Sequence, residues 1–555
     1  MTSPLDETTK LLAGLALGGS CMKTLESLRI LLASVSLSEL KEYAPKIDID
    51  RIYKCLATSN KDQIDLTCEI LKRILGAIPI GHAMVRYEDL FLQGLAHSEN
   101  RVKELIFQEL QMAADDPTTC EQLSTKLEIL LSCLQLVGST DESIARKASR
   151  VFISIARQGD TANVLVSPPI VEEMRTVSRK SDIVRYRIYD IVVTYCCTSE
   201  DKLAFCEEHQ LIQTLLEEVS TQDILVQLNA LELITTLASC QHGREYLERQ
   251  GITQKLATRL DEATADPLAS LLVPGLMKLF GALAHFQPDV LSRYPNFTNT
   301  MFNLIDDSDI SLKMISIETL SFIAIERDGK LALSQQGSKM DKAIKTIGSL
   351  FTHAFNEVRL KALNSFAELT HVAPTETIDE DVQKIIEHWF YMLNPKPIQF
   401  IMNVTKQPFR DLRFSALNIL LQLVRHNWAQ KLMSQEPGFL EFLLDRRGEP
   451  DKDCLEMKFN IVKRLSESLH PESKIWSEYC MAQMRDHVRE GLWFARVTAF
   501  DNSEIVGRSY WSCWRVEIVV KKEVNKSFFQ RGITMVQIGR PTDIRNLSSL
   551  VFGIS

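Results

Sequence analysis

One amphipathic helical pattern recurs along this chain, and the repetition restricts the possible folds more than any other feature of the sequence. Each copy has a polar turn, an aliphatic residue, a small or aliphatic residue four positions later, and further apolar residues on the same helical face. The leading aliphatic residues are Val102, Ile144, Val184, Val226, Leu312, Val358, Leu412 and Met457. Their successive separations are 42, 40, 42, 86, 46, 54 and 45 residues. A helical period of about 40 to 47 residues predicts an armadillo or HEAT-type solenoid.

Two further copies are weaker. The interval of 86 residues indicates a degenerate copy in DPLASLLVPGLMKLFGALA, which begins at Asp266 and in which Pro274 is expected to kink or restart the helix. An earlier copy begins at Ile64. In the 54-residue interval, Pro395, Pro397 and Pro408 predict a loop.

The segments between the copies repeat as well. EDKLAFCEEH leads to LIQTLLEEV, and HGREYLERQG leads to ITQKLATRL, so a short helix precedes a second amphipathic helix. Gly251, Gly337 and Gly438 stand where the first of these helices should end. One unit is therefore predicted to hold a short first helix, a middle second helix and a long third helix, which favours the armadillo form.

A single unit cannot cover its own apolar faces, so the units must stack and share one core. We predict an all-α, armadillo/HEAT-like superhelical solenoid over residues 1–495. Beyond Arg496 the helical repeat ends, and SYWSCWRVEIVVKK alternates like a strand. Residues 496–555 are predicted to be a non-repeat tail. The sequence leaves open whether this tail is a small β-like appendage, a disordered extension or an incorrectly joined segment.

Charge and cysteine usage restrict the partners and the compartment. A net charge of −9 and a pI near 5.8 provide no basic surface for nucleic acid. The acidic N-terminus and the short apolar run Leu11 to Leu17 predict neither a signal peptide nor a membrane span. Twelve cysteines without any CxxC spacing indicate reduced, structural thiols. We expect a cytoplasmic protein, with the nucleus as a second compartment.

No catalytic or metal-binding pattern emerges from the sequence. AGLALGGS, from Ala13, lacks the Lys-Ser/Thr ending of a phosphate-binding loop. The eleven histidines are scattered, and neither His242 nor His388 has a second metal ligand four residues further on. We therefore predict a binding protein that is not an enzyme and uses no cofactor or metal.

The third helices are the expected binding elements, because they line the concave groove in armadillo solenoids. Their polar residues are predicted to face solvent, and many are basic although the chain is acidic, which favours an acidic partner over the alternative of merely solvated positions. The predicted contact residues are Arg185, Arg187, Gln227, Asn229, Lys313, Arg359, Lys361, Arg413, Asn418 and Lys458. Charge reversal at Arg359, Lys361 and Arg413 is expected to abolish partner capture with little change in thermal stability.

The kind of partner is restricted by one further position. Armadillo proteins that grip extended peptides place an asparagine ten residues after the leading aliphatic residue. The corresponding residues here are Thr194, Thr236, Phe322, Glu368 and Gln422. The absence of asparagine argues against a peptide adaptor and favours a folded partner.

Three long strings give the chain a family resemblance over about residues 20 to 494. They are SDIVRYRIYDIVV from Ser181, DPLASLLVPGLMKLFGALA with RYPNF from Arg293, and QPFRDLRFSALNILLQLVRHNWAQKLMSQEPGFLEFLLDR from Gln407. With these strings the chain resembles the proteasome non-ATPase regulatory subunit 5 family. REGLWF, from Arg489, resembles the end of the family's chains, and the following tail departs from the family pattern.

The resemblance implies an assembly chaperone for the base of the proteasome regulatory particle. Such a protein would hold a module of AAA ATPase subunits through the C-terminal domain of one of them, together with the largest non-ATPase scaffold subunit. It would leave before the particle matures, and we expect it to be a monomer when free. The alternative is a general armadillo-type adaptor or transport receptor that binds peptides in its groove.

Overall fold

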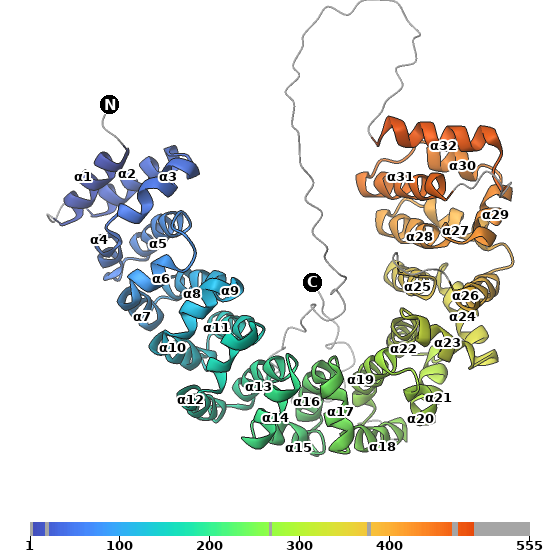
Figure 1. Cartoon of the computed structure of the whole chain (residues 1–555), viewed down its shortest axis with the longest axis horizontal. Coiled ribbons are helices and arrows are strands. Elements are labelled where there is room, and N and C mark those ends of the chain that lie inside the picture. Colours follow the sequence, from blue (N-terminus) through green and yellow to red (C-terminus); the bar gives the residue numbers. More distant parts are fainter. Residues whose placement is uncertain (1–3, 17–20, 266–268, 374–378, 469–474, 493–555) are drawn as a thin grey trace, which may run out of the picture. The chain divides into compact units, whose positions relative to one another are not determined.

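The computed structural model describes residues 4–16, 21–265, 269–373, 379–468 and 475–492. In these ranges the ordered elements are helices, joined by short turns. The predicted tail, residues 496–555, lies outside the described residues. The predicted all-α solenoid is confirmed, because the helices follow one another in stacked groups along the chain (Figure 1).

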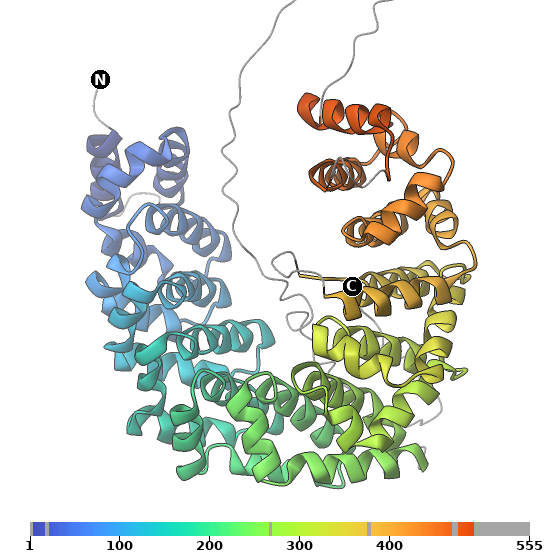
Figure 2. The same cartoon turned by 45° about the vertical axis from the view of Figure 1, so that its right-hand side comes forward.

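The long third helices form one continuous row in which each helix packs against the next (Figures 1 and 2). They are α5 (Lys61–Leu75), α8 (Asn100–Asp115), α11 (Glu142–Ala156), α13 (Asp182–Cys196), α16 (Ile224–Leu237), α19 (Val273–Phe286), α22 (Ile310–Ile323), α25 (Asn356–Leu369), α28 (Arg410–Leu423) and α31 (Lys452–Glu467). Each marker residue of the sequence pattern lies in or near the first turn of one of them. The predicted repeat therefore has the correct register.

The second helices pack behind this row. They are α7 (Glu88–Ala96), α10 (Leu127–Val137), α12 (Pro168–Ser178), α15 (Gln213–Glu218), α18 (Ile252–Ala265), α21 (Pro295–Ile305), α24 (Ser338–Leu350) and α30 (Phe439–Leu444). The short first helices are α6 (His82–Arg86), α9 (Pro117–Ser124), the 3-10 helix η3 (Gly159–Val166), α14 (Glu200–Glu208), α17 (Gln241–Arg249), α20 (Val290–Arg293), α23 (Arg327–Ser334) and α29 (Asn427–Gln435). The remaining elements are α1 (Pro4–Ala16), α2 (Cys21–Ser34), α3 (Leu37–Tyr43), η1 (Ala44–Lys46), α4 (Ile49–Tyr53), η2 (Lys54–Leu56), η4 (Ala269–Leu272), α26 (Glu380–Leu393), α27 (Pro397–Thr405) and α32 (Glu478–Glu490).

The polar turn before each copy has a direct structural reason. Asp141, Ser181, Asp223, Asp309 and Asp451 are N-cap residues whose side chains accept hydrogen bonds from backbone N–H groups in the first turn of the next third helix. These donors have no partner within the helix, so the cap replaces the water that would otherwise bind them. The polar turn thus fixes where these five third helices begin.

Proline and glycine act at most of the predicted breaks. Pro274 lies at the start of α19, so it restarts the helix as expected. Gly251, Gly337 and Gly438 have φ angles of 68°, 55° and 77°, which a residue with a side chain rarely adopts, and each separates a first from a second helix. The long prolyl loop is a partly wrong prediction, since Pro397 begins the helix α27 rather than prolonging a loop.

A single hydrophobic core runs through all the repeats. Between α19 and α21, the ring centroid of Phe280 lies 5.3 Å from that of Phe297. Between α19 and α22, a Cβ atom added at Gly281 would lie 2.7 Å from Thr319 Cγ2, so only glycine allows these helices their close approach. Each unit thus completes its core with its neighbours.

Candidate interaction surface

In four third helices, a polar residue follows the leading aliphatic residue, and its side chain is buried or half-buried. We call these four residues the cap row: Gln227, Arg359, Arg413 and Lys458. Each side chain donates to a backbone carbonyl at the end of the preceding second helix or in the turn after it. The pairs are Gln227 Nε2 to Val219 O (3.0 Å), Arg359 Nε to Phe351 O (2.9 Å), Arg413 Nη1 to Pro408 O (2.9 Å) and Lys458 Nζ to Asp445 O (3.0 Å). The last carbonyls of a helix have no partner within the helix and form the negative end of its dipole, which favours cationic donors.

Arg413 is the most deeply embedded arginine of the cap row. Its guanidinium also forms an ion pair with Glu449, whose Oε1 lies 2.9 Å from Arg413 Nη2. The two side chains are only 9% and 4% exposed. Two buried charges of this kind depend on each other, since either one alone would be left without a counter-charge.

The first helices contain a second set of caps. Arg244 donates to Ala238 O at 3.0 Å, and Lys330 donates to Ile325 O at 2.9 Å, so each caps the end of the preceding third helix. The residue before each cation is a glycine. A Cβ atom added at Gly243 or Gly329 would lie 2.0 or 1.8 Å from a carbonyl oxygen of that same third helix. In each pair, Gly243–Arg244 and Gly329–Lys330, the glycine therefore allows two helices to approach closely, and the following cation caps the end of the third helix.

The structure changes the interpretation of the predicted contact residues. Gln227, Arg413 and Lys458 are buried, so the expectation that they face solvent is wrong for these three. Their side chains are used to cap the ends of the preceding second helices, so their recurrence does not by itself indicate a partner. Arg359 is half-buried and also serves as a cap.

Arg185 and Arg187 are half-buried and bonded within the solenoid. Arg185 Nε lies 2.8 Å from Glu218 Oε1, and the buried Glu218 carboxylate also accepts from Tyr186 Oη at 2.6 Å. Arg187 Nη1 donates to Val137 O at 3.1 Å, which ties α13 to the end of α10. Arg185 therefore neutralises an internal carboxylate, whereas Arg187 caps a neighbouring helix and keeps part of its surface exposed.

The middle of each third helix presents a different surface, which we call the ladder face. It comprises the partly exposed residues three and six positions after the leading aliphatic residue, from α13 to α28. They are Arg187, Asn229, Ile315 and Lys361 at the first position, and Asp190, Glu232, Glu318, Asn364 and Asn418 at the second. Besides Arg187, three predicted contact residues belong to this face: Asn229, Lys361 and Asn418. Lys313, another predicted contact residue, lies outside this face and is half-buried in the first turn of α22.

Neighbouring repeats are joined across the ladder face by side-chain contacts. Lys361 Nζ lies 3.1 Å from Glu318 Oε1 and thereby joins α25 to α22. Ser415 Oγ donates to Asn364 Oδ1 at 2.7 Å. Asn229 and Lys313, by contrast, form no side-chain hydrogen bond or ion pair with any described residue. A partner can contact these two side chains without first displacing an internal bond.

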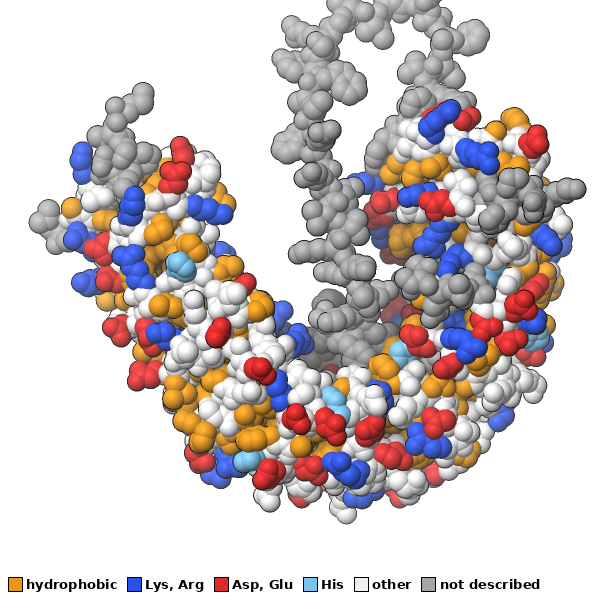
Figure 3. All heavy atoms as spheres, in the orientation of Figure 1, with side chains coloured by type: hydrophobic (Ala, Val, Ile, Leu, Met, Phe, Trp, Pro, Cys, Tyr) orange, Lys and Arg blue, Asp and Glu red, His pale blue; other side chains and the backbone are white. Residues whose placement is uncertain are grey.

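The sequence did not identify the acidic members of this face. Partial desolvation and the neighbouring Glu232 raise the pKa of Asp190 to about 6. Desolvation also raises the pKa of Glu232, and it raises that of Glu368, one turn beyond the ladder face, to about 7. The recurrence of acids six residues after the marker is visible in the sequence, but their crowding against adjacent helices is not. Acidic and basic side chains are interspersed on the side of the molecule drawn in Figure 3.

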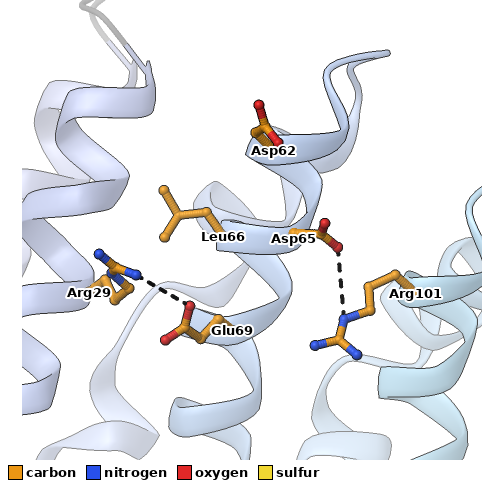
Figure 4. A pocket seen from close by; sticks show the side chains of 6 residues that line it. All are labelled: Arg29, Asp62, Asp65, Leu66, Glu69 and Arg101. Carbon is orange, nitrogen blue, oxygen red and sulfur yellow. Dashed lines mark ion pairs between the residues drawn. The ribbon is translucent and has the colours of Figure 1, made fainter.

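The described residues provide little that resembles an enclosed ligand site. One shallow hollow lies between α2, α5 and α8 (Figure 4). There Arg29 pairs with Glu69 at 3.7 Å and Arg101 with Asp65 at 3.8 Å, and all four side chains are largely exposed. Exposed pairs of this kind contribute about 0–1 kcal/mol each. We interpret the hollow as a solvated groove between helices.

Among the described residues, no group of three or more His, Cys, Asp and Glu side chains is arranged to hold a metal ion. None of the described helices combines the length and the apolar character that crossing a bilayer requires.

Stacked three-helix units with internally capped helix ends define the class of the protein, a helical-repeat scaffold that presents a surface spread over many repeats. Within that class, the chain belongs to the proteasome non-ATPase 26S subunit family, whose model matches residues 7–504. The family resemblance inferred from the sequence strings is confirmed.

Relatives and solved structures support the family and the fold respectively. The 26S proteasome non-ATPase regulatory subunit 5 of Bos taurus is 28% identical over 87% of this chain and 96% of its own length. The protein of the same name from Drosophila melanogaster is 27% identical over 76% of this chain and 83% of its own length. Among solved structures, an importin beta covers 88% of this chain and 68% of its own chain with a TM-score of 0.59 and 13% identity. That structural likeness confirms the helical-repeat fold.

Proposed function

We propose that this chain is an assembly chaperone for the base of the proteasome regulatory particle. The observation that carries the proposal is the family membership, with named regulatory-subunit relatives that align over almost their whole length. The fold supports it, since a continuous row of third helices provides broad surface for a folded domain. The residues at the asparagine positions of peptide-gripping armadillo proteins favour the same kind of partner. Glu368, for example, accepts a hydrogen bond from Ser321 at 2.7 Å.

In this proposal the ladder face holds an AAA ATPase subunit through its C-terminal domain, within a module that includes the large non-ATPase scaffold subunit. Occupation of that domain would sterically prevent premature docking on the proteolytic core. The next assembly step would release the chaperone by competing for the same surface. We expect a monomer when free, in the cytoplasm and also in the nucleus.

The contact residues proposed for this function are the predicted ones that keep a partly exposed side chain and do not cap a helix: Asn229, Lys313, Lys361 and Asn418. Arg187 is left out because its Nη1 donates to Val137 O at the end of α10. The cap row is excluded from the set because its donors are occupied by carbonyls inside the solenoid. Arg185 is excluded because it neutralises the buried Glu218.

Affinity capture of the tagged full chain tests the proposal. We expect ATPase subunits of the base and the scaffold subunit to be captured without the proteolytic core. Capture of peptide cargo without ATPase subunits would instead favour the alternative, an adaptor or transport receptor. Crosslinking mass spectrometry on the captured complex then identifies the contacted face.

A matched pair of variants tests the ladder face itself. We expect Lys313→Glu combined with Lys361→Glu to lower ATPase capture about tenfold or more, because Lys361 lies on the ladder face and Lys313 is partly exposed in the first turn of the neighbouring third helix. The control combines Lys345→Glu on α24 with Lys384→Glu on α26, which changes the same net charge at exposed positions outside the third helices. Equal loss of capture in both variants would place the contact elsewhere.

A further inference from the structure

Two cysteines from different repeats meet where three helix ends come together. Cys197 is the C-cap of α13, and Cys240 is the N-cap of α17. Their sulfur atoms lie beside consecutive carbonyls at the end of α16, Cys197 Sγ at 3.5 Å from Thr236 O and Cys240 Sγ at 3.2 Å from Leu237 O. Each thiol also shifts the pKa of the other, that of Cys197 upward and that of Cys240 downward. Both residues are partly exposed.

The surroundings of Cys240 stabilise a thiolate. His242 Nε2 lies 3.4 Å from Cys240 Sγ, and Cys240 is the N-cap of α17, whose first turn contains Gly243 and Arg244. Gly243 makes this possible, because a Cβ atom there would lie 2.7 Å from Cys240 Sγ. Cys197 lowers the pKa of Cys240 the most, and His242, the Gly243 N–H and Arg244 lower it further, against the opposing effect of burial. A cysteine at a helix N-terminus beside cationic groups is the typical setting of a reactive thiol.

A neighbouring pair of thiols provides a comparison within the same repeats. Cys206 likewise shifts the pKa of Cys196, but the two residues are 0% and 1% exposed. Cys206 and burial raise the pKa of Cys196 well above its usual range. In these repeats a buried thiol pair thus lies a few residues from a partly exposed pair.

We propose that Cys240 is a peroxide-reactive modification site and that Cys197 is its resolving cysteine. The Cys240 thiolate attacks one oxygen of hydrogen peroxide, so that a sulfur–oxygen bond forms as the oxygen–oxygen bond breaks. Hydroxide leaves and takes up a proton to become water, and Cys240 becomes a sulfenic acid. The sulfur is oxidised by two electrons, and the peroxide is reduced by two.

The second step joins the two repeats. The Cys197 sulfur attacks the Cys240 sulfur, a disulfide bond forms, and the sulfur–oxygen bond of the sulfenic acid breaks. The departing hydroxide leaves as water with the Cys197 proton. The product ties the end of α13 to the start of α17 across the end of α16. Thiol reductants reverse it by exchange.

Peptide mapping of the reduced full chain after graded peroxide treatment and alkylation tests the proposal. We expect a reversible Cys197–Cys240 linked peptide to form before any other cysteine is oxidised. In a brief alkylation pulse without peroxide, Cys240 should react about tenfold faster than Cys480, which is also partly exposed. Equal alkylation rates, or a first disulfide between any other cysteines, would overturn the proposal.

Three variants separate the roles. Cys197→Ser should trap the Cys240 sulfenic acid, detected as a dimedone adduct, and should form no disulfide at this site. Cys240→Ser should abolish both products, and it should fold normally because serine is a favoured N-cap residue. Cys206→Ser is the matched control and should leave the linked peptide unchanged. Persistence of the dimedone adduct at Cys240 in wild type at the level seen in Cys197→Ser would contradict the resolving role of Cys197.

Discussion

The first turn and the middle of the third helices are both polar in sequence, yet they have opposite roles. In the first turn, the cap row donates to carbonyls of the preceding second helix and is largely buried. In the middle, the ladder face remains partly exposed. The difference teaches that a polar residue recurring in a solenoid can satisfy the end of the neighbouring helix just as well as it can bind a partner. The role of such a residue depends on whether its side chain can reach a free carbonyl at the end of a neighbouring helix.

The largest effect is expected where the cap row contains a buried charge pair. Arg413→Met removes the partner of Glu449 and leaves a buried carboxylate without its counter-charge, which should destabilise the chain by about 3–5 kcal/mol. Chemical denaturation would measure this as a shift in the unfolding midpoint. Lys361→Met on the ladder face serves as the control and should cost less than about 1 kcal/mol, since its ion pair is half-exposed. An equal decrease in the free energy of unfolding in both variants would contradict the proposed difference between the cap row and the ladder face.

The same comparison corrects an expectation drawn from the sequence. Combined charge reversal at Arg359, Lys361 and Arg413 cannot leave the thermal midpoint unchanged, because two of the three residues are internal caps. Loss of partner capture in that triple variant would report unfolding as much as binding. Only Lys361 among the three can be reversed as a test of contact.

The glycines that accompany the caps should give the next largest effect. Gly329→Ala places a Cβ atom 1.8 Å from Ile323 O, so α23 must move away from the end of α22, at a cost of about 1–3 kcal/mol. Gly275→Ala in α19 is the matched control. Its nearest contact is Leu231 Cδ1 at 3.4 Å, and alanine favours the helix by up to about 1 kcal/mol. The two variants should therefore shift the denaturation midpoint in opposite directions, and a stabilised Gly329→Ala would contradict the close crossing.

A single neutral cap should have a smaller effect. Gln227→Leu removes the donor to Val219 O and leaves that buried carbonyl without it, which should cost about 1–2 kcal/mol. Asn229→Leu, two residues further along α16, is the control and should change stability by less than about 0.5 kcal/mol, because its side chain is partly exposed. Denaturation of both variants under one condition makes the comparison. If Asn229→Leu were the more destabilising, the assignment of Gln227 to the cap row would be wrong.

The fold could be predicted from local sequence rules, because the third helices share a repeated apolar face and many of them have their own start signal. Asp223 and Asp309 stand before their helices, Pro274 begins α19, and Gly337 has the left-handed backbone that separates two helices. Each of these features depends only on residues close to it in the sequence, so the sequence alone can predict it.

The binding surface was less accessible to prediction, because burial at the first turn depends on a helix from elsewhere in the unit. Lys458 resembles Lys361 in sequence, but it lies over the Phe442 ring at 4.2 Å and donates to Asp445 O. Cys240 was interpreted as a structural thiol because sequence spacing does not reveal Cys197, 43 residues earlier, as its neighbour. Contacts between repeats are the information that the pattern lacks.

The smallest expected effect concerns the acidic edge of the ladder face and depends on pH. Desolvation raises the pKa of Glu368 in the folded chain to about 7, above its value in the unfolded chain, so the unfolded chain loses this proton first as pH rises. The contribution of Glu368 to stability is therefore present below about pH 4.5 and is lost as pH rises through 7. Glu368→Gln keeps an acceptor for Ser321 and cannot ionise, so it should be more stable than wild type by about 1 kcal/mol at pH 8 and nearly equal to it at pH 4.5. Denaturation midpoints at the two pH values would measure this, with the exposed Glu357→Gln on the same helix as the control. If the variant were less stable than wild type at pH 8, the Glu368 carboxylate would be stabilised by its surroundings. Its charge would then contribute to folding, as the charges of the cap row do.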